Sequence, residues 1–276
     1  MAENKSMRVA EASAGERLDR VTETVLPDSG LRLRRRLCEE GRVLVDDCPR
    51  GPGYKVAAGQ RIELLPEEAG PASPADLGLL VVAKTRNFVA VYKPGGVHSA
   101  AIAGKEGPCA EAVLADLVPG EVPVLLNRLD FLTSGLLLAA LNPEGESIWR
   151  RAEETGIIRK FYLAEVRGRL DGMVTVRSRL DTADRATTRV LDEPDPDPGR
   201  WTDVKAVGHD RRADTSRVLC LIARGARHQI RAHLASIDHP IIGDPLYGDG
   251  REGEPMHLHH QRVELPGFTA EVSAPF

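Results

Sequence analysis

The chain has 276 residues, of which 42% are hydrophobic and 28% are charged, and its formal net charge is −4 at pH 7. These proportions exclude a largely disordered or fibrous chain, and the acidic balance excludes a protein whose whole surface is built to bind polyanions. No apolar run approaches the length that crosses a bilayer, and the first twenty residues lack the hydrophobic segment of a secretory signal, so we expect a cytoplasmic protein.

The first part of the chain predicts two helices followed by two strands. Apolar residues recur at helical spacing within residues 16–26 and 31–43, and Gly41 is placed to end the second helix. Residues 42–47 and 60–65 are typical of strands, and the turn between them is rich in proline and glycine. This order indicates a small α/β domain.

The second helix carries a concentrated positive charge. Five arginines fall within eleven residues: Arg32, Arg34, Arg35, Arg36 and Arg42. A stripe of this kind can bind nucleic-acid phosphates, and a solvated helix face is the alternative.

A domain boundary is expected after this segment. Residues 66–78 combine three prolines with small and acidic residues, a composition that is typical of an exposed linker. We therefore predict a first domain over residues 13–66, a linker over 67–78 and a second domain over 79–276.

The second domain contains strands and helices in irregular order. We expect two short strands within 79–94, one or two helical turns over 111–117, a buried strand over 136–141 and a helix over 143–154 capped by Asn142. Strands are then expected over 160–168 and 217–225 on either side of an acidic, proline-rich loop at 192–200, followed by a helix over 228–237 and alternating stretches at 256–265 and 268–276. This order favours an α+β fold over a doubly wound parallel sheet.

The segment NRLDFLTSGLLLAA, residues 127–140, places the charged Arg128 and Asp130 directly before a strand that we expect to be buried. A carboxylate at the edge of an apolar wall is either a costly structural pair or a reactive group, because a buried charge must be compensated. The Arg-Leu-Asp triplet alone does not distinguish these interpretations, since surface Arg/Asp pairs are common.

Three further stretches carry polar side chains in a characteristic order. KFYLAEVRG puts Lys160 and Tyr162 on one face of a strand, GARHQIRAHL begins at Gly225, and HPIIGDPLYG begins at His239. Together with NRLDFLTSG, this order resembles the RluA-type family of RNA pseudouridine synthases. The helix pair that precedes it, opened by RLDR and followed by GRVLVDD, resembles the S-four type RNA-binding module that often precedes that catalytic domain. The resemblance implies a catalytic fold with a mixed, mainly antiparallel sheet flanked by helices and loops.

The resemblance also implies an activity, the isomerisation of a uridine inside an RNA chain so that its N-glycosidic bond becomes a C-glycosidic one. Asp130 matches the catalytic carboxylate, which can act as a nucleophile at the anomeric carbon or remove a ribose proton to give a glycal. Both routes remain open. The carboxylate must be ionised, and Arg231 in the HQIR motif is the candidate partner that would stabilise and orient it.

Further positions of the family match residues that would contact the RNA substrate. Tyr162 matches the aromatic residue that can stack on a flipped uracil, with an ordinary core tyrosine as the alternative. Arg128 matches the residue that can insert into the vacated base stack, with a phosphate clamp as the alternative. The same resemblance implies that five further residues contact the substrate: Thr133, Lys160, Arg227, His228 and Gln229. For His228, as for His233, the alternative is a structural role with a hydrogen-bonded ring.

The sequence departs from the family pattern at a few positions. Phe131 and Leu132 stand where many relatives have Arg-Asp, Ala226 stands where arginine is common, and Val204 stands where an aromatic residue is usual. We expect these changes to affect the choice of substrate more than the chemistry. They also motivate a second hypothesis, an RNA-binding or ribosome-assembly protein that has lost efficient catalysis, and a hydrolase with Asp130 as nucleophile is a third.

The implied reaction needs no metal or organic cofactor. His257, His259 and His260 have no companion ligand in a known spacing, so strand histidines are favoured over a metal site, and the four scattered cysteines favour reduced thiols. The expected partner is RNA, with ribosomal RNA first and transfer RNA as the alternative, and we expect neither DNA binding nor a membrane partner. A monomer is expected because no heptad pattern is present.

Overall fold

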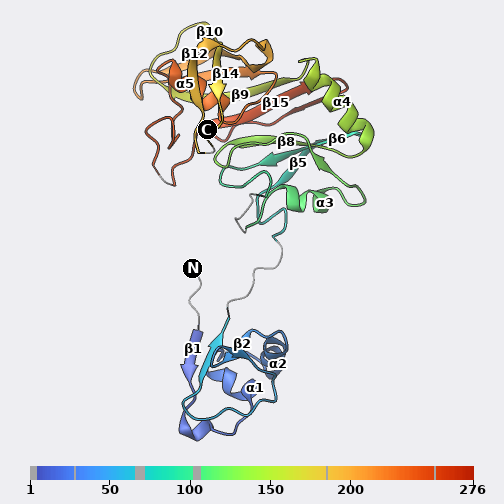
Figure 1. Cartoon of the computed structure of the whole chain (residues 1–276), viewed down its shortest axis with the longest axis vertical. Coiled ribbons are helices and arrows are strands. Elements are labelled where there is room, and N and C mark those ends of the chain that lie inside the picture. Colours follow the sequence, from blue (N-terminus) through green and yellow to red (C-terminus); the bar gives the residue numbers. More distant parts are fainter. Residues whose placement is uncertain (1–4, 28, 66–71, 102–106, 185, 252) are drawn as a thin grey trace. The chain divides into compact units, whose positions relative to one another are not determined.

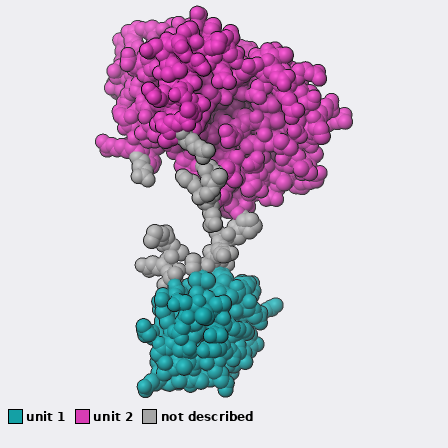
Figure 2. All heavy atoms as spheres, in the orientation of Figure 1, with its two compact units in different colours: residues 1–71 teal, residues 72–276 magenta. Residues whose placement is uncertain are grey.

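The computed structural model describes residues 5–27, 29–65, 72–101, 107–184, 186–251 and 253–276. The chain divides into two compact units, Met1–Pro71 and Ala72–Phe276, which Figure 2 shows in different colours. Within the segment expected as a linker, residues 67–71 lie outside the described residues. The chain from Ala72 onward belongs to the second unit, where Leu77 packs against the core.

In the described part of the first unit, four strands form an antiparallel sheet in the order β1-β4-β2-β3, with two short helices beside it (Figure 1). The elements are β1 (Lys5–Arg8), α1 (Leu18–Val21), α2 (Leu31–Glu39), β2 (Val43–Val45), β3 (Cys48–Pro49) and β4 (Arg61–Leu64). Both helices and the sheet contribute to one core, in which Leu18, Leu37 and Ile62 are buried. Strand β1 precedes residue 13, where we expected the first domain to begin.

The first helix is shorter than its apolar spacing predicts. After α1 the chain continues as the 3-10 turn η2 (Thr22–Thr24), and the Thr22 hydroxyl donates a 2.7 Å hydrogen bond to the Leu18 carbonyl. A threonine that bonds back to the preceding turn competes with the regular helical pattern, which accounts for the change.

In the described part of the second unit, ten strands form one sheet with the central order β10-β13-β14-β9-β15-β8-β6-β5, while β7 pairs with β8 and β16 with β15. The strands are β5 (Leu80–Lys84), β6 (Phe88–Lys93), β7 (Val124–Leu125), β8 (Ser134–Ala140), β9 (Arg159–Arg167), β10 (Met173–Val176), β13 (Thr202–Asp210), β14 (Thr215–Ile222), β15 (Leu258–Leu265) and β16 (Phe268–Glu271). Among the pairs of named strands in the described residues, β8 and β15 alone run parallel. The predicted α+β class with a mixed, mainly antiparallel sheet is confirmed.

Strand β8 is buried along its whole length, as the apolar run in the sequence predicts. Leu137 and Ala139 point into one hydrophobic cluster, and Leu136 and Leu138 point into a second cluster on the other face. Because both faces are covered, this strand has no polar alternation. It provides a rigid support for the loop that precedes it.

Gly135 allows β8 and β15 to approach closely. It pairs with His260 in the parallel register and has a φ of +118°, and a Cβ atom at this position would overlap the His260 backbone. Glycine tolerates both the conformation and the contact. The parallel junction therefore depends on this residue.

Within the described residues of this unit, three helices flank the sheet: α3 (Leu114–Leu117), which continues the 3-10 turn η3 (Glu111–Val113), α4 (Pro143–Glu154) and α5 (Gln229–Ser236). Helix α4 has the predicted bounds, and the Asn142 side chain accepts a 2.9 Å hydrogen bond from the Gly145 amide, as expected of an N-cap. Trp149 of α4 belongs to the cluster of Leu136 and Leu138.

The acidic, proline-rich segment at 192–200 is only partly a loop. Its first residues belong to β12 (Arg189–Pro194), which pairs with β11 (Ser178–Asp181) in a separate two-stranded sheet, and η4 (Pro198–Arg200) follows. Pro194 lies at the strand end, where the missing amide donor is tolerated. Within the described residues, no helix is long and apolar enough to span a bilayer.

Candidate active site

Asp130 is carried on the loop between β7 and β8, and hydrogen bonds fix the backbone of this loop on both sides of the carboxylate. The Ser99 hydroxyl accepts a 2.9 Å hydrogen bond from the Leu129 amide and donates a 2.8 Å bond to the Leu129 carbonyl. The Thr133 amide donates to the Asp130 carbonyl at 3.1 Å, and the Gly96 amide to the Phe131 carbonyl at 2.8 Å. The carboxylate is therefore presented from a rigid turn.

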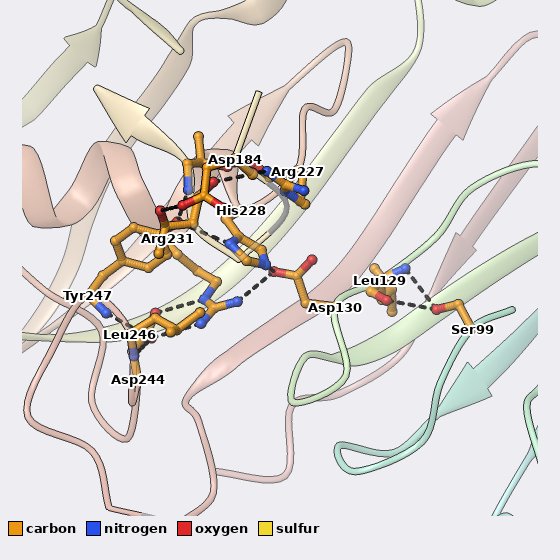
Figure 3. A network of polar contacts seen from close by, with 12 residues as sticks. Ser99, Leu129, Asp130, Asp184, Arg227, His228, Arg231, Asp244, Leu246 and Tyr247 are labelled. Atoms are coloured by element: carbon orange, nitrogen blue, oxygen red, sulfur yellow. Dashed lines mark hydrogen bonds and ion pairs between the residues drawn. The ribbon is translucent and has the colours of Figure 1, made fainter. Parts of the chain in front are cut away.

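Arg231 joins Asp130 to a second carboxylate, as Figure 3 shows. Its Nη1 donates a 3.0 Å hydrogen bond to Asp130 Oδ2, while Nε and Nη2 bind Asp244 at 2.7 and 2.8 Å. The side chains of Arg231 and Asp244 are 5% and 0% exposed, whereas that of Asp130 is 25% exposed. The structure thus brings the predicted partner to Asp130, and Asp244 is a member of the site that the sequence analysis missed.

Asp244 holds the guanidinium of Arg231 in place. Burial raises the pKa of the Asp244 carboxyl, but the hydrogen bonds and charge of Arg231 and the amides of Leu246 and Tyr247 outweigh it, so the net shift is downward. A bidentate pair of this kind is geometrically specific. Asp244 therefore fixes the orientation in which Arg231 contacts Asp130.

His228 also faces the carboxylate. Its Nε2 lies 3.9 Å from Asp130 Oδ2, and its Nδ1 lies 3.0 Å from the hydroxyl of Tyr247. Burial lowers the pKa of His228, with the attraction of Asp130 opposing this and the repulsion of Arg231 adding to it. The imidazole is therefore neutral at pH 7.

Lys93, at the end of β6, is a second residue that the sequence analysis did not place in the site. Its amine is fully buried and donates to the carbonyls of Pro94 at 2.7 Å, Val97 at 2.9 Å and Phe131 at 3.4 Å. Burial lowers its pKa to about 7, and the charge of Asp130 opposes the shift. The Lys-Pro-x-Gly element at 93–96 was the available signal.

Tyr162 of β9 lies in the interior, close enough to Asp130 for the carboxylate charge to affect its phenol. Burial raises the pKa of its phenol, and the Asp130 carboxylate adds to this shift, so the hydroxyl stays protonated at neutral pH. Its ring stacks on His260 with centroids 4.5 Å apart and an interplanar angle of 16°. Burial lowers the pKa of His260 to about 3, so this supporting ring is uncharged.

The remaining residues expected near the substrate lie in different environments. Arg128 is exposed, and its side chain has no ion-pair partner among the described residues. Thr133 is buried, and its hydroxyl lacks a hydrogen-bond partner among the described residues. Arg227 donates to the carbonyls of Thr182 and Thr187, so it braces the segment between β11 and β12.

Two residues expected to contact the substrate have side-chain partners within the protein. Gln229 is 2% exposed, and its side chain donates to the carbonyls of Arg200 and Trp201 and accepts from the Ala226 amide. The Lys160 amine lies 3.7 Å from Glu153 and over the Trp149 ring of α4. Lys160 lies on the same face of β9 as Tyr162, but its long side chain places the amine against α4.

The arginines of α2 also differ from one another. Arg34 is buried and paired with Glu23 at 3.0 Å, so it is not available to bind a phosphate. Arg35 donates to the buried Asp19 at 2.9 Å, and Arg36 lies 3.4 Å from Glu40. Arg32 is exposed. Of the four arginines predicted to bind RNA, Arg34 therefore differs from the others, because its side chain joins the interior of the unit.

His257, directly before β15, and the two histidines of β15 each have a protein partner. His257 bonds to Glu165 at 2.7 Å, His259 to Ser134 at 2.8 Å and His260 to the Leu136 carbonyl at 2.6 Å. His233 likewise lies between Thr202 and the Ser178 carbonyl. Within the described residues, no group of three His, Cys, Asp or Glu side chains could hold a metal ion, and the four cysteines are free thiols.

The assembled groups define a class of protein before any relative is considered. A partly exposed carboxylate, fixed by a guanidinium and flanked by a neutral imidazole and a buried tyrosine, is suited to attack a carbon or to accept a proton. On this mixed sheet, the arrangement is that of an α+β enzyme with a carboxylate at the centre of its candidate site.

Comparison with known proteins identifies the family. The sequence model described as RNA pseudouridylate synthase matches residues 87–236, which include Asp130, Tyr162 and Arg231. An uncharacterized RNA pseudouridine synthase of Chloroflexus aurantiacus is 32% identical over 276 residues, with 96% of this chain and 84% of that protein covered. Ribosomal large subunit pseudouridine synthase D of Neisseria meningitidis is 30% identical, with 86% of this chain and 65% of that protein covered. The chain thus spans slightly less than two thirds of the Neisseria relative.

A solved structure agrees. Human RNA pseudouridylate synthase domain containing 1 superimposes with a TM-score of 0.58 and 29% identity, covering 72% of this chain and 83% of that one. The chain therefore belongs to the RNA pseudouridylate synthase family.

Proposed function

We propose that this protein converts specific uridines of structured ribosomal RNA to pseudouridine and that Asp130 is the catalytic carboxylate. The observation that carries the proposal is the Asp130–Arg231–Asp244 arrangement, in which a buried pair fixes a guanidinium against a partly exposed carboxylate. Relatives named as ribosomal large subunit pseudouridine synthases support ribosomal RNA as the substrate.

The reaction rearranges bonds without adding or removing atoms overall. The bond between ribose C1′ and uracil N1 breaks, the uracil turns while it is held, and C1′ bonds to a ring carbon. That carbon loses its proton, and N1 gains one. Asp130 serves this sequence either as a nucleophile that bonds to C1′ and leaves again, or as a base that removes a ribose proton to give a glycal and later returns it.

Arg231 has two functions in this proposal. It holds the Asp130 side chain in one direction, and it stabilises the ionised carboxylate that either route requires. Because Asp244 binds two nitrogens of the same guanidinium, Arg231 does not have to be reorganised when substrate binds.

Tyr162 and Arg128 would handle the base. The target uridine must leave its stack to reach Asp130, at a cost of a few kcal/mol. Stacking on Tyr162, whose other face is covered by His260, can return roughly 1–3 kcal/mol. The exposed Arg128, two residues before Asp130, would fill the vacated position in the RNA.

We further propose that the first unit is an S-four type RNA-binding domain that contacts RNA through α2. Arg32, Arg35 and Arg36 are the exposed arginines of this helix. They give a local positive charge on a chain whose net charge is negative, so RNA affinity should depend strongly on salt.

The proposal is tested by mapping pseudouridine in total RNA from cells with and without the protein, and with Asp130→Asn in its place. We expect one or more ribosomal sites to depend on the protein and Asp130→Asn to lower their formation by more than about 10³-fold, as the loss of an essential catalytic group commonly does. Asn keeps the size of the side chain, and binding of RNA by this variant should be unchanged.

Each contrary result identifies a different error. If no site depends on the protein although it binds ribosomal RNA, the catalytically weak RNA-binding protein is the correct hypothesis. If Asp130→Asn retains full activity, the assignment of Asp130 is wrong. Release of free uracil instead of pseudouridine would indicate the hydrolase.

A further inference from the structure

The backbone of His228 has a conformation that is uncommon for a residue with a side chain. Its φ and ψ are +53° and 17°, in the left-handed region, and its carbonyl accepts a 2.9 Å bond from the Ala232 amide at the start of α5. Such a conformation costs roughly 1–3 kcal/mol and persists where the surrounding structure enforces it. Here it accompanies an imidazole that is only 12% exposed and has Nε2 near Asp130.

A chain of hydrogen bonds determines which ring nitrogen of His228 carries the proton. The Thr188 amide donates to the hydroxyl oxygen of Tyr247 at 2.6 Å, and the same oxygen lies 3.0 Å from His228 Nδ1. Because the phenol already accepts from an amide, its own hydrogen is left to donate, and Nδ1 is the acceptor it reaches. In the neutral ring the remaining hydrogen is then on Nε2.

The charged groups around His228 keep it in this neutral form. Asp130 and Asp244 favour the imidazolium, whereas Arg231, Arg227 and burial oppose it, and the pKa is lowered overall. The ring therefore presents one N–H, on the nitrogen that faces Asp130 in Figure 3. At 3.9 Å this nitrogen is too far from Oδ2 for a direct hydrogen bond, which leaves its donor available.

The chemistry at Asp130 indicates what this donor would meet. In both routes the carboxylate approaches C1′ or the hydrogen on C2′ of the target ribose, and these carbons are bonded to each other. The 2′-hydroxyl oxygen is attached to C2′, so a donor located 3.9 Å from Oδ2 is close to this oxygen. This hydroxyl also distinguishes RNA from DNA.

We propose that His228 donates an Nε2–H hydrogen bond to the 2′-hydroxyl of the target nucleotide and that Tyr247 is the positioning residue that fixes the required tautomer. The proposal rests on the function proposed above. It gives the site a direct means of preferring ribose over deoxyribose, and it gives Tyr247 a role that involves no contact with the substrate.

The first experiment measures this preference. A transcript carrying the mapped uridine, and the same RNA with 2′-deoxyuridine at that one position, are bound to the Asp130→Asn protein, which prevents turnover. The additional substitutions are Tyr247→Phe, His228→Gln and His228→Asn. A glutamine amide can replace Nε2 as donor, whereas the asparagine amide occupies the position of Nδ1.

We expect about tenfold tighter binding of the ribose form by the parent and by His228→Gln, the equivalent of one hydrogen bond of about 1.4 kcal/mol. Tyr247→Phe and His228→Asn should lose most of this ratio. His233→Gln is the control, because it alters a buried, hydrogen-bonded histidine of the same helix that faces Thr202 and Ser178. This control should lower stability and keep the ratio. An unchanged ratio in Tyr247→Phe would overturn the proposal.

The second experiment does not depend on activity. The ¹⁵N chemical shifts of the His228 ring in the uniformly labelled full chain report which nitrogen is protonated. We expect the Nε2–H tautomer in the wild type and a mixture of tautomers in Tyr247→Phe. An Nδ1–H tautomer in the wild type contradicts the inference even if pseudouridine is formed, whereas absence of pseudouridine with the Nε2–H tautomer present contradicts only the proposed function.

Discussion

The triplet Arg-Leu-Asp occurs four times in the chain, and the copies at residues 17–19 and 128–130 place their aspartates in different environments. In the first unit Asp19 is fully buried and receives two hydrogen bonds from Arg17 and one from Arg35, so its oxygens are occupied. In the second unit Asp130 receives one side-chain bond among the described residues, and it comes from Arg231 rather than from Arg128. The two carboxylates thus differ in how completely their acceptors are used.

Lys93 gives the stability of the second unit a specific pH dependence. Its pKa in the folded protein is about 7, below the ordinary value of 10.5. Between these values the unfolded chain binds a proton that the folded chain does not, so the folded state gains stability as pH rises from 7 to 10, by at most about 1.4 kcal/mol per pH unit. Lys93→Met removes this contribution.

The measurement is urea unfolding of the wild type and Lys93→Met at pH 6, 7, 8.5 and 10, followed by tryptophan fluorescence. Both tryptophans, Trp149 and Trp201, lie in the second unit, so the signal reports that unit. We expect the free-energy difference, wild type minus variant, to be constant below pH 7 and to increase above it. A difference that does not vary with pH would show that Lys93 remains charged throughout.

At the scale of elements, the junction of β8 and β15 depends on the lack of a side chain at Gly135. Gly135→Ala would place a methyl group against the His260 backbone at a φ of +118°, so the parallel pair must separate. We expect a loss of several kcal/mol in unfolding free energy and, because β8 supports the Asp130 loop, loss of activity. Urea unfolding and pseudouridine formation measure the two effects.

Gly172→Ala is the matched control for this substitution. Gly172 also has a positive φ, +70°, but a methyl group there would meet no atom within 4 Å. Its cost should therefore be limited to the backbone, about 1–2 kcal/mol. Equal losses in the two variants would mean that conformation rather than the close approach makes Gly135 necessary.

The elements predicted well are those whose signals are local. Asn142 and the residues after it specify α4 because the cap and the apolar spacing lie within one segment. The strands β10, β11 and β13 were missed because they are partly exposed and carry polar residues, so pairing with neighbours distant in sequence stabilises them.

The candidate site could be predicted only in part for the same reason. Asp130, Tyr162 and Arg231 were predicted from motif order, and the structure brings Arg231 to Asp130. The sequence could not show that Asp244 orients Arg231 or that Tyr247 contacts His228. Asp244 and Tyr247 lie in a turn-rich segment, and the order of residues in such a segment does not indicate which side chains it brings close together. The protein partners of Gln229 and Lys160 could not be predicted either, because a motif identifies a position and not the direction of its side chain.

At the scale of the whole molecule, binding of RNA by an acidic chain must come from a few exposed positive residues, and α2 provides a test. Arg36 pairs with Glu40 on the surface at 3.4 Å, an interaction worth little, so it can exchange the carboxylate for a phosphate. Arg32→Ala and Arg36→Ala should each weaken RNA binding and reduce the slope of log affinity against log salt concentration by about 1.

Two control substitutions distinguish the loss of a phosphate contact from a loss of stability and from the loss of any exposed positive charge. Arg34→Ala removes a buried arginine paired with Glu23, so it should lower stability and leave the salt slope of the folded protein unchanged. Arg169→Ala removes an exposed arginine of the second unit that pairs with Asp171, and it should leave both quantities unchanged. Filter binding of the target transcript to the full chain over a range of salt concentrations gives the slopes. Equal slopes in the wild type, Arg32→Ala and Arg36→Ala would show that α2 does not contact phosphates and would assign RNA binding to the second unit.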